Sequence, residues 1–312
     1  MNRFFYLILF SIIIWSCKKD DDKEEPVVVP AKSLKEVSIT DDEAIVSYLK
    51  SHYYNYEEFA NPPADFDYKI KIDSIEGDNA NKESLFENDN LITEEIKVSS
   101  IDFGIDDEEV DVIHKLYSLI VTEGKGSNPS VADSVYLKYE GKLLNGKIFD
   151  SNKIWFDLQG TGSQSNGGVI EGFQQGLPEF KSGDGIVNNP DGTFEVENFG
   201  KGLIFMPSGL AYFRGTQPGK AYSPLIFEID LYAVNSADHD RDGVPSIVED
   251  LNNDKNLFND DTDEDKFPNY LDADDDNDGK LTKDEIVIDA EGNITYPDSD
   301  NDGVPDYLDS DS

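Results

Sequence analysis

The clearest pattern of apolar and polar positions lies between residues 116 and 234. In one stretch every second residue is apolar, at Val135, Leu137 and Tyr139. This period of two is typical of a strand with one buried face. Asn145-Gly146 follows, a dipeptide that favours the positive φ angles of a hairpin turn. We therefore predict two antiparallel strands that meet at this turn, the second passing through Phe149.

Four further elements are predicted in this region. Residues 169–177 predict a short helix, because apolar residues recur with the spacing of one helix face. These residues are Val169, Ile170, Phe173 and Leu177. Residues 202–213 and 224–234 read as two more strands. Residues 185–200 contain Asn-Pro-Asp-Gly, the composition of a turn, and predict an added hairpin.

Residues 37–112 have a weaker pattern. The sequence Thr-Asp-Asp-Glu at 40–43 fits a helix capping box, and the helix should end before Asn-Pro-Pro at 61–63. Its apolar face would carry Ile45, Tyr48, Leu49 and His52. Alternation over 66–72 predicts a strand, and the acidic stretch 77–90 predicts a loop. No catalytic chemistry is indicated in this part.

Five sequence motifs follow one another in residues 117–231. They are Y-x6-G-x-G-x2-P-x3-D-x-V-x3-Y-x-G, G-K-x-F-D-S, V-I-x-G-F-x2-G, M-P-S-x-L-A-Y and L-I-F-E-I-x-L. In this order they resemble the FKBP-type peptidyl-prolyl cis-trans isomerases. The resemblance implies an α+β fold in which an antiparallel sheet wraps on a short helix. It also implies an enzyme that acts on proline-containing polypeptides and needs no cofactor for catalysis.

The resemblance also implies an apolar catalytic pocket. An Xaa-Pro bond isomerises slowly because its partial double bond must twist, and a dry aromatic pocket favours the twisted amide over the planar one. Asp150 would be a buried carboxylate beside the twisting carbonyl, and the Tyr212 hydroxyl would donate to a substrate carbonyl. The walls would be Tyr139, Phe149, Val169, Ile170, Phe173, Tyr212 and Phe227.

Three departures from the family pattern bear on this pocket. Phe173 stands where the family most often has Trp, and the segment 185–200 is an insertion. Phe213 replaces the usual Gly, and the loop that follows lacks the Ile-Pro that normally caps the cleft. If Phe213 or the inserted hairpin filled the cleft, binding of proline peptides should vanish, and a non-catalytic surface protein would be favoured over an enzyme.

The charge and the cysteine content exclude several classes of function. The net charge is −40, which would repel nucleic acid and anionic lipid and favours cations as partners. We therefore expect no nucleic-acid partner. Cys17 is the one cysteine, so neither an intrachain disulfide nor a thiol-rich metal site can form.

The first residues predict export and lipid anchoring. An apolar run from Phe4 to Trp15 follows Arg3 and is too short for a mature membrane span, as expected of a secretory signal. Ser16-Cys17 and the charged stretch after it resemble the lipobox of bacterial lipoproteins, although Trp15 departs from it. Acylation of Cys17 would anchor the chain, since several acyl chains together bind a membrane stably. The alternative is a free cysteine in an ordinary signal peptide.

The composition changes sharply after Asn235. Residues 237–312 contain 26 Asp or Glu against 5 Lys or Arg, a local net charge of −21. Four windows place carboxylates at positions 1, 3, 5 and 12, the ligand spacing of a calcium loop. The predicted calcium ligands are Asp238, Asp240, Asp242 and Glu249; Asp261, Asp263, Asp265 and Asp272; Asp274, Asp276, Asp278 and Glu285; and Asp298, Asp300, Asp302 and Asp309.

The spacing of these windows and their prolines resemble thrombospondin type 3 repeats, while the third window reads as an EF-hand loop. A degenerate loop with Asn252, Asp254 and Asn256 lies between the first two windows. We expect no flanking helices and little core, and without metal the carboxylates should repel one another. The alternative is a disordered acidic tail.

Two functions are compatible with this organisation. The first is a lipid-anchored prolyl isomerase that assists the folding of exported proteins, placed at the outer membrane with surface exposure left open. The second is a non-catalytic, calcium-dependent surface binding or adhesion lipoprotein. The sequence leaves the client, the membrane leaflet and the oligomeric state open. The predicted segments are 1–16 signal peptide, 17–36 acylated tether, 37–112 extension, 113–235 isomerase domain and 236–312 calcium repeats.

Overall fold

The computed structural model describes residues 32–105, 109–160, 168–215 and 218–312. The predicted signal peptide, the acylation site at Cys17 and most of the tether lie outside these residues. Residues Lys32–Ser312 form one compact unit. Across the ranges described, we find no helix with the length and apolarity needed to cross a membrane.

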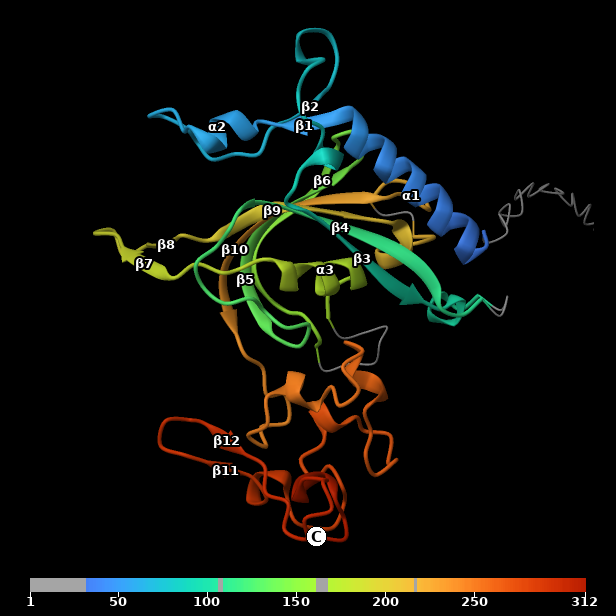
Figure 1. Cartoon of the computed structure of the whole chain (residues 1–312), viewed down its shortest axis with the longest axis vertical. Helices are drawn as coiled ribbons and strands as arrows, with labels where there is room; N and C mark the ends of the chain where they lie inside the picture. Colours follow the sequence, from blue (N-terminus) through green and yellow to red (C-terminus); the bar gives the residue numbers. More distant parts are fainter. Residues whose placement is uncertain (1–31, 106–108, 161–167, 216–217) are drawn as a thin grey trace, which may run out of the picture. The chain divides into compact units, whose positions relative to one another are not determined.

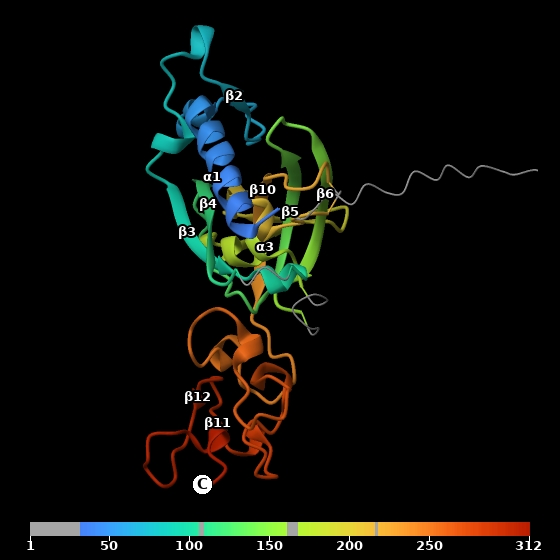
Figure 2. The same ribbon diagram turned by 90° about the vertical axis from the view of Figure 1, so that its right-hand side faces the viewer.

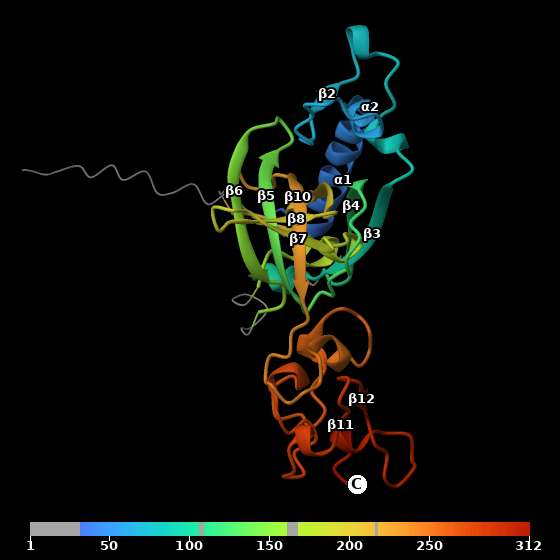
Figure 3. The same cartoon turned by 90° about the vertical axis from the view of Figure 1, so that its left-hand side faces the viewer.

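A six-stranded antiparallel sheet forms the centre of this unit (Figure 1). The strand order is β3-β4-β9-β10-β5-β6, and Figure 3 shows β6, β5 and β10 side by side. The predicted hairpin is confirmed, with Gly146 at φ +78° in its turn. Alternation therefore located the first strand, and the turn residues located the second. The strands are β3 (Leu91–Val98), β4 (Val112–Thr122), β5 (Ser134–Leu143), β6 (Ile148–Asp157), β9 (Gly200–Met206) and β10 (Leu225–Asn235).

One face of the sheet, called here the inner face, packs against the predicted short helix. This helix is α3 (Glu171–Gly176), and the turn η4 (Leu177–Glu179) continues it. Phe173 and Leu177 are buried against strand residues of the same core cluster. Those strand residues are Leu116, Val135, Leu137, Tyr139, Ile204, Met206, Phe227, Ile229 and Leu231.

The opposite, outer face is covered by the N-terminal extension. Helix α1 (Leu34–Ser51) lies along β4 (Figure 2), and its residues Ile45 and Leu49 are buried. They pack with strand residues of a second core cluster, Tyr117, Leu119, Leu203, Phe205 and Ile226. Because β4 and β9 contribute to both clusters, the sheet is buried on both sides there.

The capping box predicted at 40–43 is wrong. The helix begins at Leu34, and the Ser33 side chain caps it by accepting from the Glu36 backbone N–H at 3.2 Å. Thr40 lies inside the helix, where its hydroxyl donates to the Glu36 carbonyl at 2.9 Å. Asp41 faces inward and accepts from the Ser208 N–H at 2.7 Å and from its hydroxyl at 2.6 Å. This carboxylate fastens α1 to the turn η5 (Ser208–Leu210).

The strand predicted at 66–72 is also wrong. Only Ile72 is in a strand, because Tyr68 has a φ of +53° and Phe66 packs edge-on against Phe59 at 5.0 Å. The predicted helix is interrupted by a short strand at His52. The remaining elements of the extension are β1 (His52–Tyr54), α2 (Tyr56–Ala60), β2 (Ile72–Ser74), η1 (Gly77–Asn79), η2 (Leu85–Glu87) and η3 (Ser100–Phe103).

The inserted hairpin is confirmed as β7 (Gly185–Asn188) and β8 (Phe194–Glu197). Gly192 supplies the positive φ of +86° in its turn. The Phe194 ring lies 6.4 Å from that of Tyr136. Tyr136 alternates with the inner-face residues of β5, so the hairpin lies on the outer side there and does not cover the aromatic rings of the inner face.

The acidic tail consists of loops joined by single turns and contains no α-helix within the part described. The small cluster of Val244, Ile286 and Tyr307 stabilises its distal half. Leu257 and Tyr270 pack with Val131 and Ala132 of the loop before β5. The tail elements are η6 (Ser246–Glu249), η7 (Leu257–Asn259), η8 (Asn269–Leu271), η9 (Thr282–Asp284), β11 (Val287–Ile288), β12 (Ile294–Thr295) and η10 (Asp306–Leu308).

Candidate functional site

Three aromatic rings from three elements meet on the inner face. Tyr139 comes from β5, Phe227 from β10 and Phe173 from α3, and all three are buried. Phe173 stands edge-on to Phe227 at 5.3 Å and to Tyr139 at 6.1 Å between ring centroids. Edge-to-face contacts at such distances are the favoured geometry of aromatic pairs. The structure therefore brings these three predicted pocket residues together.

Strand β6 supplies two further rings. Phe149 is perpendicular to Phe227 at 5.7 Å. Phe156, which the sequence analysis missed, lies 5.7 Å from both Tyr139 and Phe173. Its place in β6, where it pairs with the buried Val135, is the signal that could have found it. Val169 and Ile170 are partly buried against the same cluster, as predicted.

A break in the β5–β6 ladder places Phe149 and Asp150 in this site. The pairing shifts between Gly141 and Lys142, so that Phe149 has no partner on β5. Such a bulge re-aims side chains, since two consecutive residues can then point to the same side. A Cβ on Gly141 would lie 2.6 Å from Phe149 Cζ and 2.9 Å from Phe227 Cε1. Gly141 is therefore required for the close approach of these rings.

A polar group of three residues lies at the edge of the aromatic site. The Tyr139 hydroxyl donates to Asp150 Oδ2 at 2.6 Å. Burial, and then this hydrogen bond to a carboxylate, raise the pKa of Tyr139 far above its ordinary value. Burial and the Asp150 charge also raise the pKa of Tyr212. Both phenols therefore keep their protons at neutral pH and can donate hydrogen bonds.

The expectation that Asp150 is buried is wrong. Asp150 is exposed, because β6 is the last strand of the sheet and no element described here packs beyond it. Tyr212 is also accessible, with 43% of its surface exposed. Both polar groups can therefore be reached from solvent, while the rings below them are dry.

Phe213 does not stack on the rings of the site. Its backbone has a φ of +42°, and its buried ring lies 4.4 Å from Phe103 and 5.1 Å from Tyr222. Arg214 donates to the Phe103 carbonyl at 2.8 Å. The N-terminal extension thus holds the segment after Tyr212.

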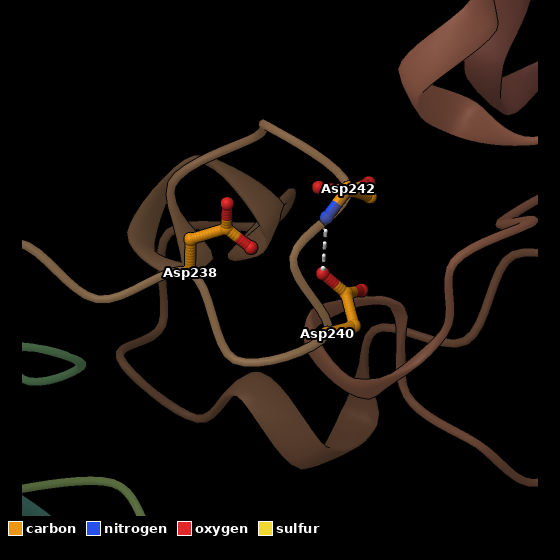
Figure 4. Close-up of side chains that lie close together, drawn as sticks. All are labelled: Asp238, Asp240 and Asp242. Atoms are coloured by element: carbon orange, nitrogen blue, oxygen red, sulfur yellow. Dashed lines mark hydrogen bonds between the residues drawn. The ribbon is translucent and has the colours of Figure 1, made fainter.

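The acidic loops of the tail repeat one backbone conformation. In the first loop Arg241 and Gly243, at positions 4 and 6, have positive φ. The Gly243 N–H donates to Asp238 Oδ2 at 3.2 Å, and Figure 4 shows how the three carboxylates of this loop lie. The Asp242 N–H donates to Asp240 at 3.2 Å. The degenerate loop folds in the same way, with the Lys255 N–H donating to Asp250 at 3.0 Å.

Carboxylate oxygens gather in each of the four predicted windows. In every window one oxygen from each of positions 1, 3 and 5 lies within 4.8 Å of the others. Of the four residues at position 12 in the described tail, Glu249 alone belongs to an oxygen group, a separate one that it forms with Asp240 and Asp275, while Asp272, Glu285 and Asp309 belong to none. The groups formed by positions 1, 3 and 5 are Asp238, Asp240 and Asp242; Asp261, Asp263 and Asp265; Asp274, Asp276 and Asp278; and Asp298, Asp300 and Asp302.

Several of these oxygens are buried without a hydrogen-bond partner, including both of Glu249 and one each of Asp240 and Asp242. Burial and then nearby carboxylates raise the pKa of Glu249 to about 11 and that of Asp275 to about 9. Unpaired buried carboxylates are costly unless they bind a metal or take up a proton. The donor set consists of oxygens alone and therefore fits a hard cation such as Ca²⁺.

These raised pKa values give the metal-free tail an unusual pH dependence. A carboxyl whose folded pKa exceeds its unfolded value stabilises the fold below the unfolded pKa, near 4, and loses that contribution as the pH rises towards the folded pKa. In the presence of a chelator, we expect the tail to unfold at a lower temperature at pH 8 than at pH 5.5. Calorimetry of residues 32–312 measures this, and an equal or higher temperature at pH 8 would contradict it.

Comparison with known proteins finds a match in the central domain and another in the tail. Residues 125–189 match the family model of FKBP-type peptidyl-prolyl cis-trans isomerase, and residues 239–296 match the model described as BamM C-terminal. The FKBP-type peptidyl-prolyl cis-trans isomerase FkpA of Escherichia coli is 31% identical over 124 residues, which is 38% of this chain and 37% of that protein. The peptidyl-prolyl cis-trans isomerase Mip of Coxiella burnetii is 30% identical over 122 residues, 37% of this chain and 43% of that protein.

The chain thus spans well under half the length of these relatives. The crystal structure of Escherichia coli FkpA overlaps 38% of this chain and 48% of its own, at 30% identity and a TM-score of 0.29. That score is too low to support a conclusion about the fold. The family model and the sequence relatives support the FKBP-type peptidyl-prolyl cis-trans isomerase family for the central domain of this chain.

Proposed function

We propose that this protein is a peptidyl-prolyl cis-trans isomerase that acts on proline-containing polypeptides and assists the folding of exported proteins. The observation that carries the proposal is the meeting of Tyr139, Phe173 and Phe227 beneath the accessible groups Asp150 and Tyr212. The family model and the relatives that match this domain support it.

The site can favour the twisted amide in two ways. The twisted Xaa-Pro bond has lost resonance and polarity, so an apolar floor of rings stabilises it relative to the planar amide. The protonated hydroxyl of Tyr212 would donate to a substrate carbonyl. Asp150 positions the Tyr139 phenol through their 2.6 Å hydrogen bond and adds a negative charge at the edge of the aromatic site. These steps require neither a nucleophile nor a metal.

An isomerisation assay tests this proposal. With residues 32–312 and a short Xaa-Pro peptide, we expect acceleration of the cis-to-trans rate. Tyr212→Ala and Asp150→Ala should each lower kcat/KM about tenfold, the equivalent of one hydrogen bond lost in the transition state. Trp155→Ala is the matched control, because Trp155 is an exposed ring on the same strand as Asp150. Its kcat/KM should stay within about twofold of the unmodified chain.

If the folded chain does not accelerate isomerisation, the proposal that it is an enzyme is contradicted. The alternative, a non-catalytic binding protein, would then explain the aromatic site better.

We propose secondly that the tail binds calcium through its acidic loops. The grouped oxygens, the repeated loop backbone and the unpartnered buried carboxylates support this proposal. Ca²⁺ takes six to eight oxygen ligands at 2.3–2.6 Å, and loops of this kind outside the cell bind it at ~10⁻⁴–10⁻³ M. Filled sites would cancel the repulsion among the carboxylates and stiffen the tail.

Calcium titration tests the second proposal. In a chelator-treated chain, 5 mM CaCl₂ should raise the unfolding temperature of the tail by several degrees, while equal MgCl₂ should raise it less, because Mg²⁺ demands a tighter octahedron. Asp300→Asn should reduce the calcium retained on equilibrium dialysis. An unchanged unfolding temperature together with no retained calcium would leave the acidic tail without a metal function.

We propose thirdly that Cys17 is acylated and anchors the protein outside the cytoplasm, at the outer membrane. The motif around Cys17 supports this proposal. Metabolic labelling with a fatty-acid analogue should mark the full-length chain, and Cys17→Ser should abolish the label. Equal labelling of both chains would contradict the anchor. Full-length chains are needed because the motif lies at the N-terminus.

A further inference from the structure

The first acidic loop faces a carboxylate from a different loop. Glu249 ends the first loop, is 1% exposed and has no hydrogen-bond partner on either carboxylate oxygen. Oxygens of Asp240, Glu249 and Asp275 all lie within 4.8 Å of one another. Asp275 belongs to the third loop, is also 1% exposed, and leaves Oδ1 without a partner. It was not among the ligands predicted from the 1, 3, 5, 12 spacing.

The orientation of Asp275 is fixed by Thr282. The Asp275 N–H donates to Thr282 Oγ1 at 3.2 Å, and that hydroxyl donates to Asp275 Oδ2 at 3.2 Å. Thr282 is fully buried. Because Oδ2 is held in this way, Oδ1 is the oxygen free to face Glu249 and Asp240.

The same hydrogen bond closes the other three loops, although none of them has a carboxylate at position 2. In the first, second and fourth loops the N–H at position 2 donates to the side chain at position 9, as in the third. The residues at position 2 there are His239, Thr262 and Ser299, and their acceptors are Ser246, Asn269 and Asp306. The third loop therefore does not need the carboxylate of Asp275 in order to close. The presence of a buried carboxylate at this position needs another explanation.

Within the described residues, no cationic side chain forms an ion pair with these three carboxylates. Among the ion pairs of the described residues, none involves Asp240, Glu249 or Asp275, and Lys280 pairs with Glu285. Two buried carboxylates and a half-buried third that converge without a cation would be strongly unfavourable. Oxygen atoms in this arrangement are the donors that Ca²⁺ prefers.

We propose that Asp275 is a ligand of the calcium ion that Asp240 and Glu249 bind, so that one ion joins the first acidic loop to the third. This inference rests on the calcium binding proposed above. The shared ion fixes the third loop against the first, and its loss releases two loops together. The first site therefore differs from the fourth, whose three grouped carboxylates come from one loop.

Asp275→Asn in residues 32–312 tests this proposal, with Asp284→Asn as the matched control. Both changes remove one negative charge from the same repeat, but Asp284 is exposed and belongs to none of the oxygen groups. Asn can still accept from Thr282, so the loop can close. We expect Asp275→Asn to retain one calcium ion fewer at a concentration that saturates the unmodified chain, and to weaken that site about tenfold or more. Asp284→Asn should retain the full number.

The unfolding temperature gives a second readout, which a merely structural role would not produce. With a chelator, Asp275→Asn should unfold at a higher temperature than the unmodified chain, because a neutral amide replaces a buried carboxyl group that lies close to two other carboxyl groups. With calcium the order should reverse. In calcium titrations, Glu249→Gln combined with Asp275→Asn should lose no more ions than either change alone, since both act on one ion.

The possible outcomes distinguish this inference from the calcium binding on which it rests. If the unmodified chain binds no calcium, both are overturned. If it binds calcium and Asp275→Asn retains as much as Asp284→Asn, the shared ligand is overturned and calcium binding stands. Lower stability of Asp275→Asn in chelator with unchanged calcium retention would assign Asp275 a packing role and also overturn the inference.

Discussion

Apolar side chains on both faces of the central strands are the constraint on which this architecture depends. In β9, Ile204 and Met206 face α3, while Leu203 and Phe205 face α1. Each such side chain gains about 1.5–3 kcal/mol on full burial, so neither face can be left in water. The helix α3 covers one face and carries the floor of the aromatic site. The extension must cover the other, and this explains why a segment without catalytic residues accompanies the domain.

Local patterns predicted the elements that depend on local chemistry. The hairpin at Gly146, the short helix α3 and the closed acidic loops all follow from turn residues or regular spacing. Features that depend on distant partners were missed. The alternation at Phe66 resembles a strand, but packing against Phe59 decides its conformation. Likewise, the exposure of Asp150 follows from the last position of β6 in the sheet, which no local pattern records.

The central domain and the acidic tail are stabilised by different interactions. The central domain excludes water from rings and aliphatic side chains, and polar side chains such as Tyr139 and Asp150 pair with one another. The tail has only small apolar clusters, and backbone N–H groups orient its carboxylates towards common points. Hydrophobic burial is nearly independent of dissolved ions at ordinary concentrations, whereas converging carboxylates depend on them. Ionic conditions should therefore act on the tail and leave the aromatic site intact.

The extension covers the outer face of the sheet, and this determines which fragments of the protein can stay soluble. The segment that matches the isomerase family model, residues 125–189, is much smaller than the compact unit Lys32–Ser312. A fragment cut at residue 113 would lose α1 and β3 and would present Leu119, Leu203 and Phe205 to solvent as one apolar surface. Contiguous apolar patches of this kind promote self-association. Aggregation of an excised domain would therefore reflect the missing cover and would say nothing about the capacity of the aromatic site to bind proline.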